Sequence, residues 1–444
     1  GTEKIGKLLM QYAIPAIIAM TASSLYNMVD SIFIGHGVGP LAIAGLAITF
    51  PFMNLAAAFG SLVGVGASTL VAIKLGQKDK DGAVHVLGNV VMLNGIIGLI
   101  FMTVALLFLD PILLFFGASP DTLPYAREYM QVILAGNLIT HIYMGLNEVL
   151  RASGYPQKAM AATLTAVIVN CGLDALFIMG FGWGIRGAAL ATICSQFIGM
   201  LWVLYHFYSP KTYIRFQRHS MRLKQHIIAN IFAIGMSPFV MNVCACCIVI
   251  FINNRLLNYG GDMAICAFGI LNRIQMLFVM IVMGITMGMQ PITGYNYGAQ
   301  HFDRVKRTLK LGITAGCIIT TLGFIIGELF PGIFVGMFTD NHELTDEATL
   351  ALRIGILSFP VVGAQIVITQ FFQSIGKARI SIFLSLSRQL LFLLPGLAFL
   401  PPFYGVEGVW FSMPLSDALA FAVAALMLAY HYKKKMSGTD LRTA

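Results

Sequence analysis

The chain has 444 residues, of which 58% are hydrophobic and only 11% are charged. This balance excludes a set of ordinary water-soluble domains and indicates a polytopic membrane protein. The net charge of +9 does not indicate a nucleic-acid partner, because the basic residues stand in short clusters between apolar segments, where the positive-inside rule places them.

Membrane-spanning helices need about 20 apolar residues each, and the chain contains segments of this kind from one end to the other. The first continues past any signal-peptide length and is interpreted as a spanning helix. An even number of spans puts both termini on one side, and the basic clusters predict that this side is the cytoplasm. The twelve predicted spans are residues 10–34, 45–73, 87–109, 124–149, 159–180, 187–208, 229–257, 263–295, 311–332, 349–374, 381–400 and 406–432.

Two halves of the chain resemble each other. AIPAIIAM around Pro15 matches GMSPFVMN around Pro238, and KLGQKDKDGAVHVL at Lys74 matches NYGAQHFDRVKRTL at Asn296. LRASGYPQKA and GIRGAALA have counterparts in FQSIGKA and GVEGVWFS, again about 222 residues later. We therefore predict an all-α integral membrane protein with twelve transmembrane helices in two pseudo-symmetric six-helix lobes around a central cavity. The predicted parts are an N-terminal lobe (1–215), a basic cytoplasmic linker (216–228) and a C-terminal lobe with a short cytoplasmic tail (229–444).

Three aspartates lie well inside predicted spans: Asp30, Asp174 and Asp417. A charge at membrane depth costs about 2.5 to 3.5 kcal/mol on insertion scales, so each is a candidate functional residue. Asn170 stands four residues before Asp174 and shares its helical face. At about 1.5 Å per residue, Asp30, Asp174 and Thr192 lie at a similar depth, within ~10 Å of the outer face.

These polar groups support more than one interpretation. Two carboxylates, an amide and a hydroxyl offer oxygen ligands to a small hard cation such as Na⁺. Two neighbouring carboxylates in an apolar region also resist double ionisation, which makes one of them a candidate proton carrier. Alternatively, the groups only join helices, at about 0.6 kcal/mol per hydrogen bond.

In combination, the motifs LYNMVDSIFIG, GASTL, LRASGYPQKA, NCGLD and GIRGAALAT, with GMQPITGYNYGA in the second half, resemble the multidrug and toxic compound extrusion family, prokaryotic branch. The resemblance covers essentially the whole chain. It implies export of organic, often cationic, compounds in exchange for H⁺ or Na⁺. It further implies a cation site at Asp30, Asn170, Asp174 and Thr192, a substrate cavity that includes Tyr26, Tyr129 and Asn147, and a bend point in the first helix at Pro15.

The second half departs from the pattern of some family members. Its predicted spans 229–257 and 349–374 contain no carboxylate, and Asn253 stands where the repeat offset puts the counterpart of Asp30. We therefore expect the N-terminal lobe to dominate cation coupling. Arg273, Arg388 and Asp417 remain in this half, and an Arg–Asp pair is favoured over direct contact with substrate.

Two other function classes fit the sequence less well. A flippase for lipid-linked oligosaccharide or peptidoglycan precursors needs a strongly basic cavity, and few basic residues are central. An intramembrane enzyme is not expected, because no HExxH or GxSxG motif is present and the nine histidines are scattered. We expect no cofactor and no metal beyond Na⁺. The expected partners are small organic molecules and the lipid bilayer, and we expect a monomer in a prokaryotic cytoplasmic membrane. The choice between H⁺ and Na⁺ stays open.

Overall fold

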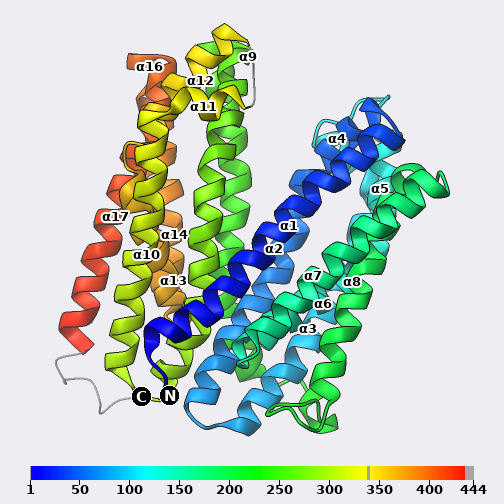
Figure 1. Ribbon diagram of the computed structural model, residues 1–444, viewed down its shortest axis with the longest axis vertical. Helices are drawn as coiled ribbons and strands as arrows, with labels where there is room; N and C mark the ends of the chain where they lie inside the picture. The colour runs from blue at the N-terminus through cyan, green and yellow to red at the C-terminus, as the bar shows by residue number, and fades with distance from the viewer. Residues whose placement is uncertain (1, 338–340, 436–444) are drawn as a thin grey trace. The chain divides into compact units, whose positions relative to one another are not determined.

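The structure, a computed structural model, describes residues 2–337 and 341–435. All regular secondary structure in these ranges is helical (Figure 1). Contacts divide the chain into two units. The first unit holds Met10–Asn242 and Gly294–Phe302, and so includes the predicted linker at residues 216–228; the second holds Thr2–Leu9, Val243–Thr293 and the residues from Asp303 onward. The predicted tail at residues 436–444 lies outside the described part of the chain.

The first unit contains most of α1 and the helices up to the start of α9. In chain order the elements are α1 (Ile5–Gly37), α2 (Pro40–Gly76), α3 (Lys80–Leu107), α4 (Leu109–Phe115), α5 (Leu123–Ala135), α6 (Asn137–Ala152), α7 (Pro156–Asp174), the π-helix η1 (Ala175–Gly180), α8 (Gly184–Tyr208) and the 3₁₀ turn η2 (Arg218–Met221).

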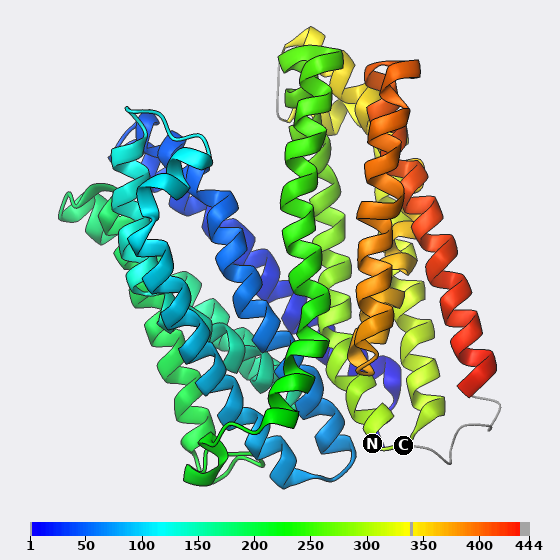
Figure 2. The ribbon, with the colours of Figure 1, turned by 180° about the vertical axis from the view of Figure 1, so that it is seen from behind.

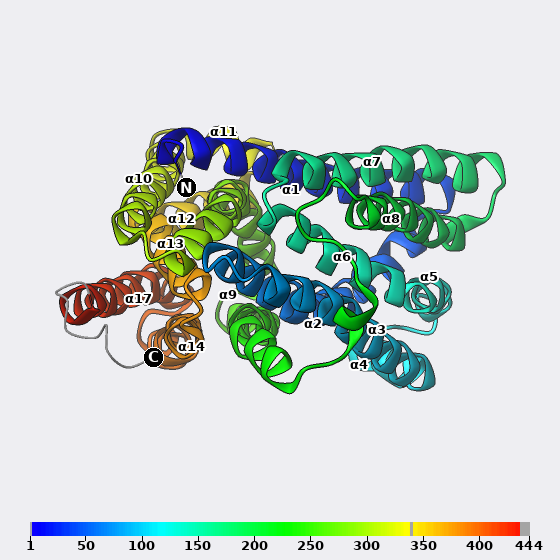
Figure 3. The ribbon, with the colours of Figure 1, turned by 90° about the horizontal axis from the view of Figure 1, so that it is seen from below.

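Helices α2, α3, α6, α7 and α8 pack around one apolar core of the first unit. Figure 3 shows α7 and α8 side by side, with α1 running along α7. Small residues allow some of these close approaches: a Cβ added at Gly64 of α2 would lie 3.3 Å from Cα of Gly145 on α6. A second core of this unit contains Ile34, Tyr129 and Ile178, and so connects α1, α5 and η1.

The second unit is built around a core from α9, α12, α13 and α17. Helix α9 (Gln225–Gly298) covers two predicted spans, 229–257 and 263–295, and breaks at Gly261, where φ is 69° and ψ is −165°. Only glycine adopts this conformation readily. The remaining elements are α10 (Phe302–Leu329), α11 (Pro331–Gly336), α12 (His342–Gly355), α13 (Phe359–Ser374), α14 (Ala378–Leu386), the π-helix η3 (Ser387–Leu393), α15 (Leu394–Phe399), α16 (Pro401–Tyr404) and α17 (Val406–Lys435).

Ten described helical segments are long and apolar enough to cross a membrane, and an eleventh results if α12 and α13 are taken as one span bent by 55°. The remaining predicted span, residues 124–149, is not one continuous helix. It consists of α5 and α6, which are separated at Gly136. Many large apolar side chains, such as Leu107, Phe115 and Tyr205, are more than two-thirds exposed, which suits a surface that faces lipid.

The backbone repeats where the sequence repeats. Lys78 and Gln300 both have φ of 60°, a conformation that is uncommon outside glycine, and they are 222 residues apart. Two glycine pairs at positive φ have nearly the same spacing: Gly154 and Gly376 are 222 residues apart, and Gly184 and Gly405 are 221 residues apart. The matched motifs therefore form the same turns in both halves of the chain.

Candidate functional site

Asp30 lies in the apolar part of α1 and is 4% exposed. Its carboxyl group interacts directly with that of Asp174, the fully buried last residue of α7. Oδ1 of each aspartate is buried and has no hydrogen-bond partner among the described residues. Two adjacent carboxylates repel each other unless a proton or a cation lies between them, so this pair is suited to bind one.

Asn170 and Thr192 lie next to this pair. The hydrogen-bond network orients the amide of Asn170 so that its nitrogen donates to Oδ2 of Asp174 over 2.8 Å. In this orientation its oxygen accepts from Oγ1 and from the backbone nitrogen of Thr192, over 3.2 and 3.1 Å. The structure therefore brings α7 and α8 together through the residues that spacing and depth selected.

Tyr26 joins α1 to the same network. Tyr26 precedes Asp30 by one helical turn, and its hydroxyl lies 3.0 Å from Oγ1 of Thr192. Tyr129 on α5 is 2% exposed and lies close enough to interact electrostatically with Tyr26 and both aspartates. The five residues Tyr26, Asp30, Asn170, Asp174 and Thr192 are called the aspartate cluster below. All of them lie in the first unit.

A π-helix begins directly after Asp174. In η1 the backbone nitrogen of Phe181 donates to the carbonyl of Leu176, five residues earlier, over 2.9 Å. Gly37 of α1 packs against this segment, since an added Cβ would lie 2.3 Å from Cγ2 of Ile178. Single π turns inside helices are frequent at functional sites. This wider turn sets where the end of α7 lies against α1, and no motif in the sequence indicated it.

Asn147 and Pro15 are the two remaining residues that the family resemblance implies. Asn147 on α6 is 7% exposed, and its amide nitrogen donates to Oγ1 of Thr163 over 3.1 Å. Its Oδ1 is buried without a partner among the described residues, so no described hydrogen bond joins it to the aspartates. Pro15 is buried within α1, which is a continuous helix here. Its role as a bend point stays a prediction.

The second unit forms the Arg–Asp pair that was favoured from the sequence. Nε of Arg388, in η3, donates to Oδ1 of Asp417, on α17, over 2.7 Å. Arg273 on α9 is exposed. Asn253, at the repeat position of Asp30, has a buried Oδ1 without a hydrogen-bond partner in the described part of the chain. Asp417 is thus paired with a basic side chain, whereas Asp30 and Asp174 of the first unit interact with each other.

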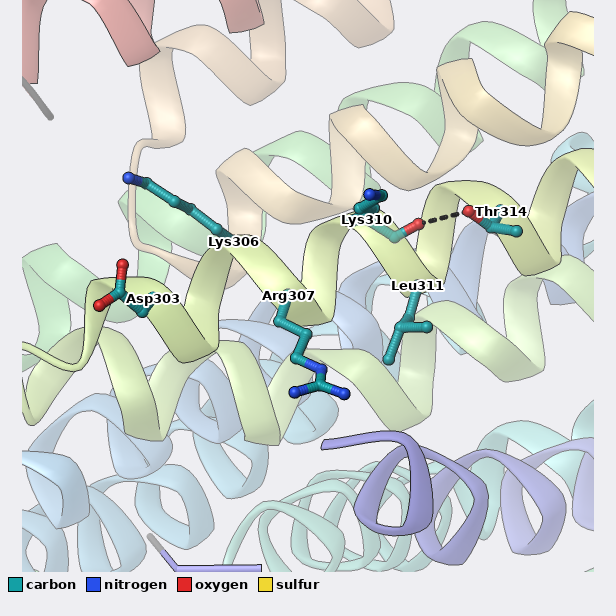
Figure 4. A pocket seen from close by; sticks show the side chains of 6 residues that line it. All are labelled: Asp303, Lys306, Arg307, Lys310, Leu311 and Thr314. Carbon is teal, nitrogen blue, oxygen red and sulfur yellow. Dashed lines mark hydrogen bonds between the residues drawn. The ribbon is translucent and has the colours of Figure 1, made fainter. Parts of the chain in front are cut away.

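A basic hollow of about 450 Å³ lies along α10 in the second unit. Figure 4 shows its six lining residues, all from this one helix, with Lys306 and Arg307 extending to opposite sides. Three of the six lining residues are basic, and their charged groups do not converge on one point. The hollow is therefore not a candidate for the predicted cation site.

Sequence reasoning missed one cluster. The histidines were expected to be scattered, yet His85 and His219 lie together with Asp81 in the first unit. His219 in η2 comes more than 130 positions after Asp81 and His85 of α3, so no local spacing could have revealed that it meets them.

Known proteins resemble the chain along nearly its full length. The family model MatE matches residues 15–176 and 238–397. Multidrug export protein MepA of Staphylococcus aureus is 26% identical over 431 residues, which cover 97% of this chain and 95% of the relative. A structure of the MATE multidrug transporter DinF-BH is 34% identical, with a TM-score of 0.90 and 97% coverage of both chains. The "Crystal structure of MATE in the bent conformation" is 26% identical, with a TM-score of 0.93 and 98% coverage of both chains.

Proposed function

The chain belongs to the multidrug and toxic compound extrusion family, and on that basis we propose that it exports organic, often cationic, compounds in exchange for H⁺ or Na⁺ by alternating access. Members of this family are membrane transporters and not enzymes. The relatives named as multidrug exporters support the choice of substrate class. We further propose a bacterial cytoplasmic membrane location with both termini in the cytoplasm, as the basic clusters predict.

The observation that carries this proposal is the contact between Asp30 and Asp174 inside the aspartate cluster. A proton or Na⁺ arriving from outside binds between the two carboxyl groups. Asn170 supports Asp174 through its amide nitrogen, and the hydroxyls of Tyr26 and Thr192 complete the polar surroundings. The coupling ion and a positively charged substrate compete for the same negative charge. When the ion neutralises the aspartate pair, the affinity of the pair for the substrate is therefore lost.

The second step couples this binding to movement of α1. Pro15 lacks a backbone N–H, so the helical hydrogen-bond ladder of α1 is interrupted there. The proline lies 15 residues before Asp30, about 22 Å along a straight helix. Related proteins were solved in a bent and in a straight conformation. We propose that cation binding at Asp30 favours one position of α1 and that substrate favours another.

The flippase alternative receives less support. Binding a pyrophosphate needs free basic groups in the cavity, and Arg388 is already paired with Asp417. Arg273 is exposed on α9. Flipping of a fluorescent lipid-linked precursor by the protein in proteoliposomes would favour the flippase over the exporter.

The proposal is tested in proteoliposomes loaded with a fluorescent organic cation. A pH gradient and a Na⁺ gradient are imposed one at a time, so that the coupling ion is identified by the gradient that drives export. Asp30→Asn and Asp174→Asn should each abolish gradient-driven export at normal protein abundance. Asp346→Asn, at an exposed position on α12, is the matched control and should export like the unchanged protein. Full export by Asp30→Asn would overturn the mechanism.

A further inference from the structure

We propose that Asp81, His85 and His219 form a binding site for a divalent transition-metal ion of the Zn²⁺ class, separate from the aspartate cluster. Asp81 lies in the first turn of α3, His85 follows one turn later, and His219 lies in η2 of the linker. Each side chain offers one ligand atom, and these atoms all lie within 4.8 Å of one another. The linker runs beside the start of α3 in Figures 2 and 3.

The separations suit a small metal ion. Nε2 of His219 lies 3.6 Å from Oδ1 of Asp81, and a ring nitrogen of His85 lies within 4.8 Å of the ligand atoms of both. Ligands around a tetrahedral Zn²⁺, at about 2.0 to 2.1 Å from the metal, are about 3.3 to 3.4 Å apart. Small side-chain movements are therefore enough to close the three groups on one ion.

The site is held in place by contacts that do not involve its own ligands. Asn89, one turn after His85 on α3, donates to the carbonyls of Ser220 and Arg222 over 3.4 and 3.1 Å, and it accepts from the backbone nitrogen of Lys224 over 3.1 Å. Gly88 allows the approach, because an added Cβ would lie 2.1 Å from the carbonyl oxygen of Ser220. His219 is thus fixed opposite Asp81 by its chain neighbours.

The histidine on α3 is positioned by its own helix. His85 is 5% exposed, and its Nδ1 lies 2.9 Å from the backbone carbonyl oxygen of Asp81. When Nδ1 carries the proton of this hydrogen bond, Nε2 has a free lone pair. A hydrogen bond from one ring nitrogen to a carbonyl is the usual support of a metal-binding histidine.

The charged residues around the three ligands partly favour and partly oppose a bound cation. Lys80 points over the ring of Tyr213, with Nζ 4.7 Å from the ring centroid. Lys74 is paired with Asp79 at 3.0 Å, and Asp79 lies close enough to His85 to interact electrostatically. The exposed Arg218 and Arg222 of the linker oppose binding.

The donor set selects the class of metal. Two imidazoles and one carboxylate suit Zn²⁺ and its first-row neighbours, whereas Na⁺, Mg²⁺ and Ca²⁺ prefer oxygen ligands throughout. The bland interpretation is an exposed ion pair, since the side chains of Asp81 and His219 are 73% and 54% exposed. A bound metal ion, unlike an ion pair, would connect the linker to α3 through three coordination bonds.

The test is a Co²⁺ titration of the full-length protein, purified without a histidine tag and freed of metal by a chelator. One equivalent of Co²⁺ should produce visible absorption bands, and Zn²⁺ should remove them by competition. His219→Ala and Asp81→Asn should each weaken Zn²⁺ binding by more than about 10- to 100-fold, the loss that follows when only an outer-shell partner of a ligand is removed. Both positions are exposed, so the variants should fold.

His226→Ala is the matched control, because this exposed histidine lies in the first turn of α9 and outside the cluster. It should bind Co²⁺ like the unchanged protein. Equal binding by His219→Ala, or the absence of a stoichiometric absorption band, would show an ion pair only and overturn the proposal.

Discussion

The hydroxyl of Tyr26 on α1 lies 3.0 Å from Oγ1 of Thr192 on α8, and this hydrogen bond continues to Asp174 through Asn170. The first helix is therefore connected to the buried carboxyl group of Asp174 in two ways, through this series of hydrogen bonds and through Asp30 directly. An ion or proton that changes the charge of Asp30 and Asp174 therefore also changes the interactions that position α1.

Replacing Tyr26 by Phe should slow export while leaving the protein folded. One hydrogen bond contributes only about 0.5 to 1.5 kcal/mol to the free energy of unfolding, but this part-buried bond connects α1 to α8. Export rate and thermal midpoint are measured on the same preparation. Tyr12→Phe, on the same helix, is the control and should leave export unchanged. Unaltered export by Tyr26→Phe would remove the hydroxyl from the mechanism.

Asn170→Ala should lower the free energy of unfolding by about 1 to 3 kcal/mol, because Oδ2 of the buried Asp174 loses its donor. Unfolding in detergent, followed by circular dichroism, measures this change. The comparison is Asn27→Ala, at an exposed position on α1, which should differ little from the unchanged protein. If the two variants are equally stable, the amide does not support Asp174.

The Arg388–Asp417 pair should behave as one unit in a double-mutant cycle. Asp417→Asn should cost about 1.5 to 3 kcal/mol, the range for hydrogen bonds to charged groups, reduced by the 36% exposure of the Arg388 side chain. Adding Arg388→Gln should cost little more, since its partner is already neutral. Gradient-driven export should persist in both variants. Additive losses of stability would show that the two side chains act independently.

Asp79 should make stability depend on pH in the acid range. The backbone N–H of Gly82, and then Lys74, hold the pKa of this carboxyl below its ordinary value of 3.8. Because the pKa is lower in the folded protein, the contribution is complete above about pH 4 and is lost as the pH falls through the folded-state pKa. Asp79→Asn keeps the helix cap but cannot titrate, so its thermal midpoint should fall less between pH 5 and pH 3. Parallel curves for both proteins would contradict this assignment.

Gly88→Ala should loosen the linker. The added Cβ would lie 2.1 Å from the carbonyl oxygen of Ser220, which forces η2 away from α3. Trypsin should then cleave faster after Arg218 and Arg222, and the proposed metal affinity should fall. Gly95→Ala on the same helix is the control, because an added Cβ there meets no atom within 4 Å. Equal cleavage of the two variants would mean that the linker does not depend on this contact.

Much of the candidate site was predictable because it depends on positions along single helices. The spacing of Asn170 and Asp174 puts them on one helical face. The rise of about 1.5 Å per residue places Asp30 and Thr192 at a similar depth in the membrane. The same reasoning could not find the π turn of η1, the break at Gly136 or the 55° bend between α12 and α13. Hydropathy measures how apolar a segment is and is insensitive to local changes of hydrogen-bond register.

The sequence by itself determined the membrane class, the repeat and the family, because composition, periodicity and motif order are properties of the chain alone. Only the tertiary structure decided which polar groups meet: Asp30 with Asp174, Arg388 with Asp417, and His85 with His219. The physical reason is that contacts between different helices depend on rotation and packing within each unit, down to a missing Cβ at Gly88. A change of one helical turn would separate each pair while leaving every apolar segment as it is.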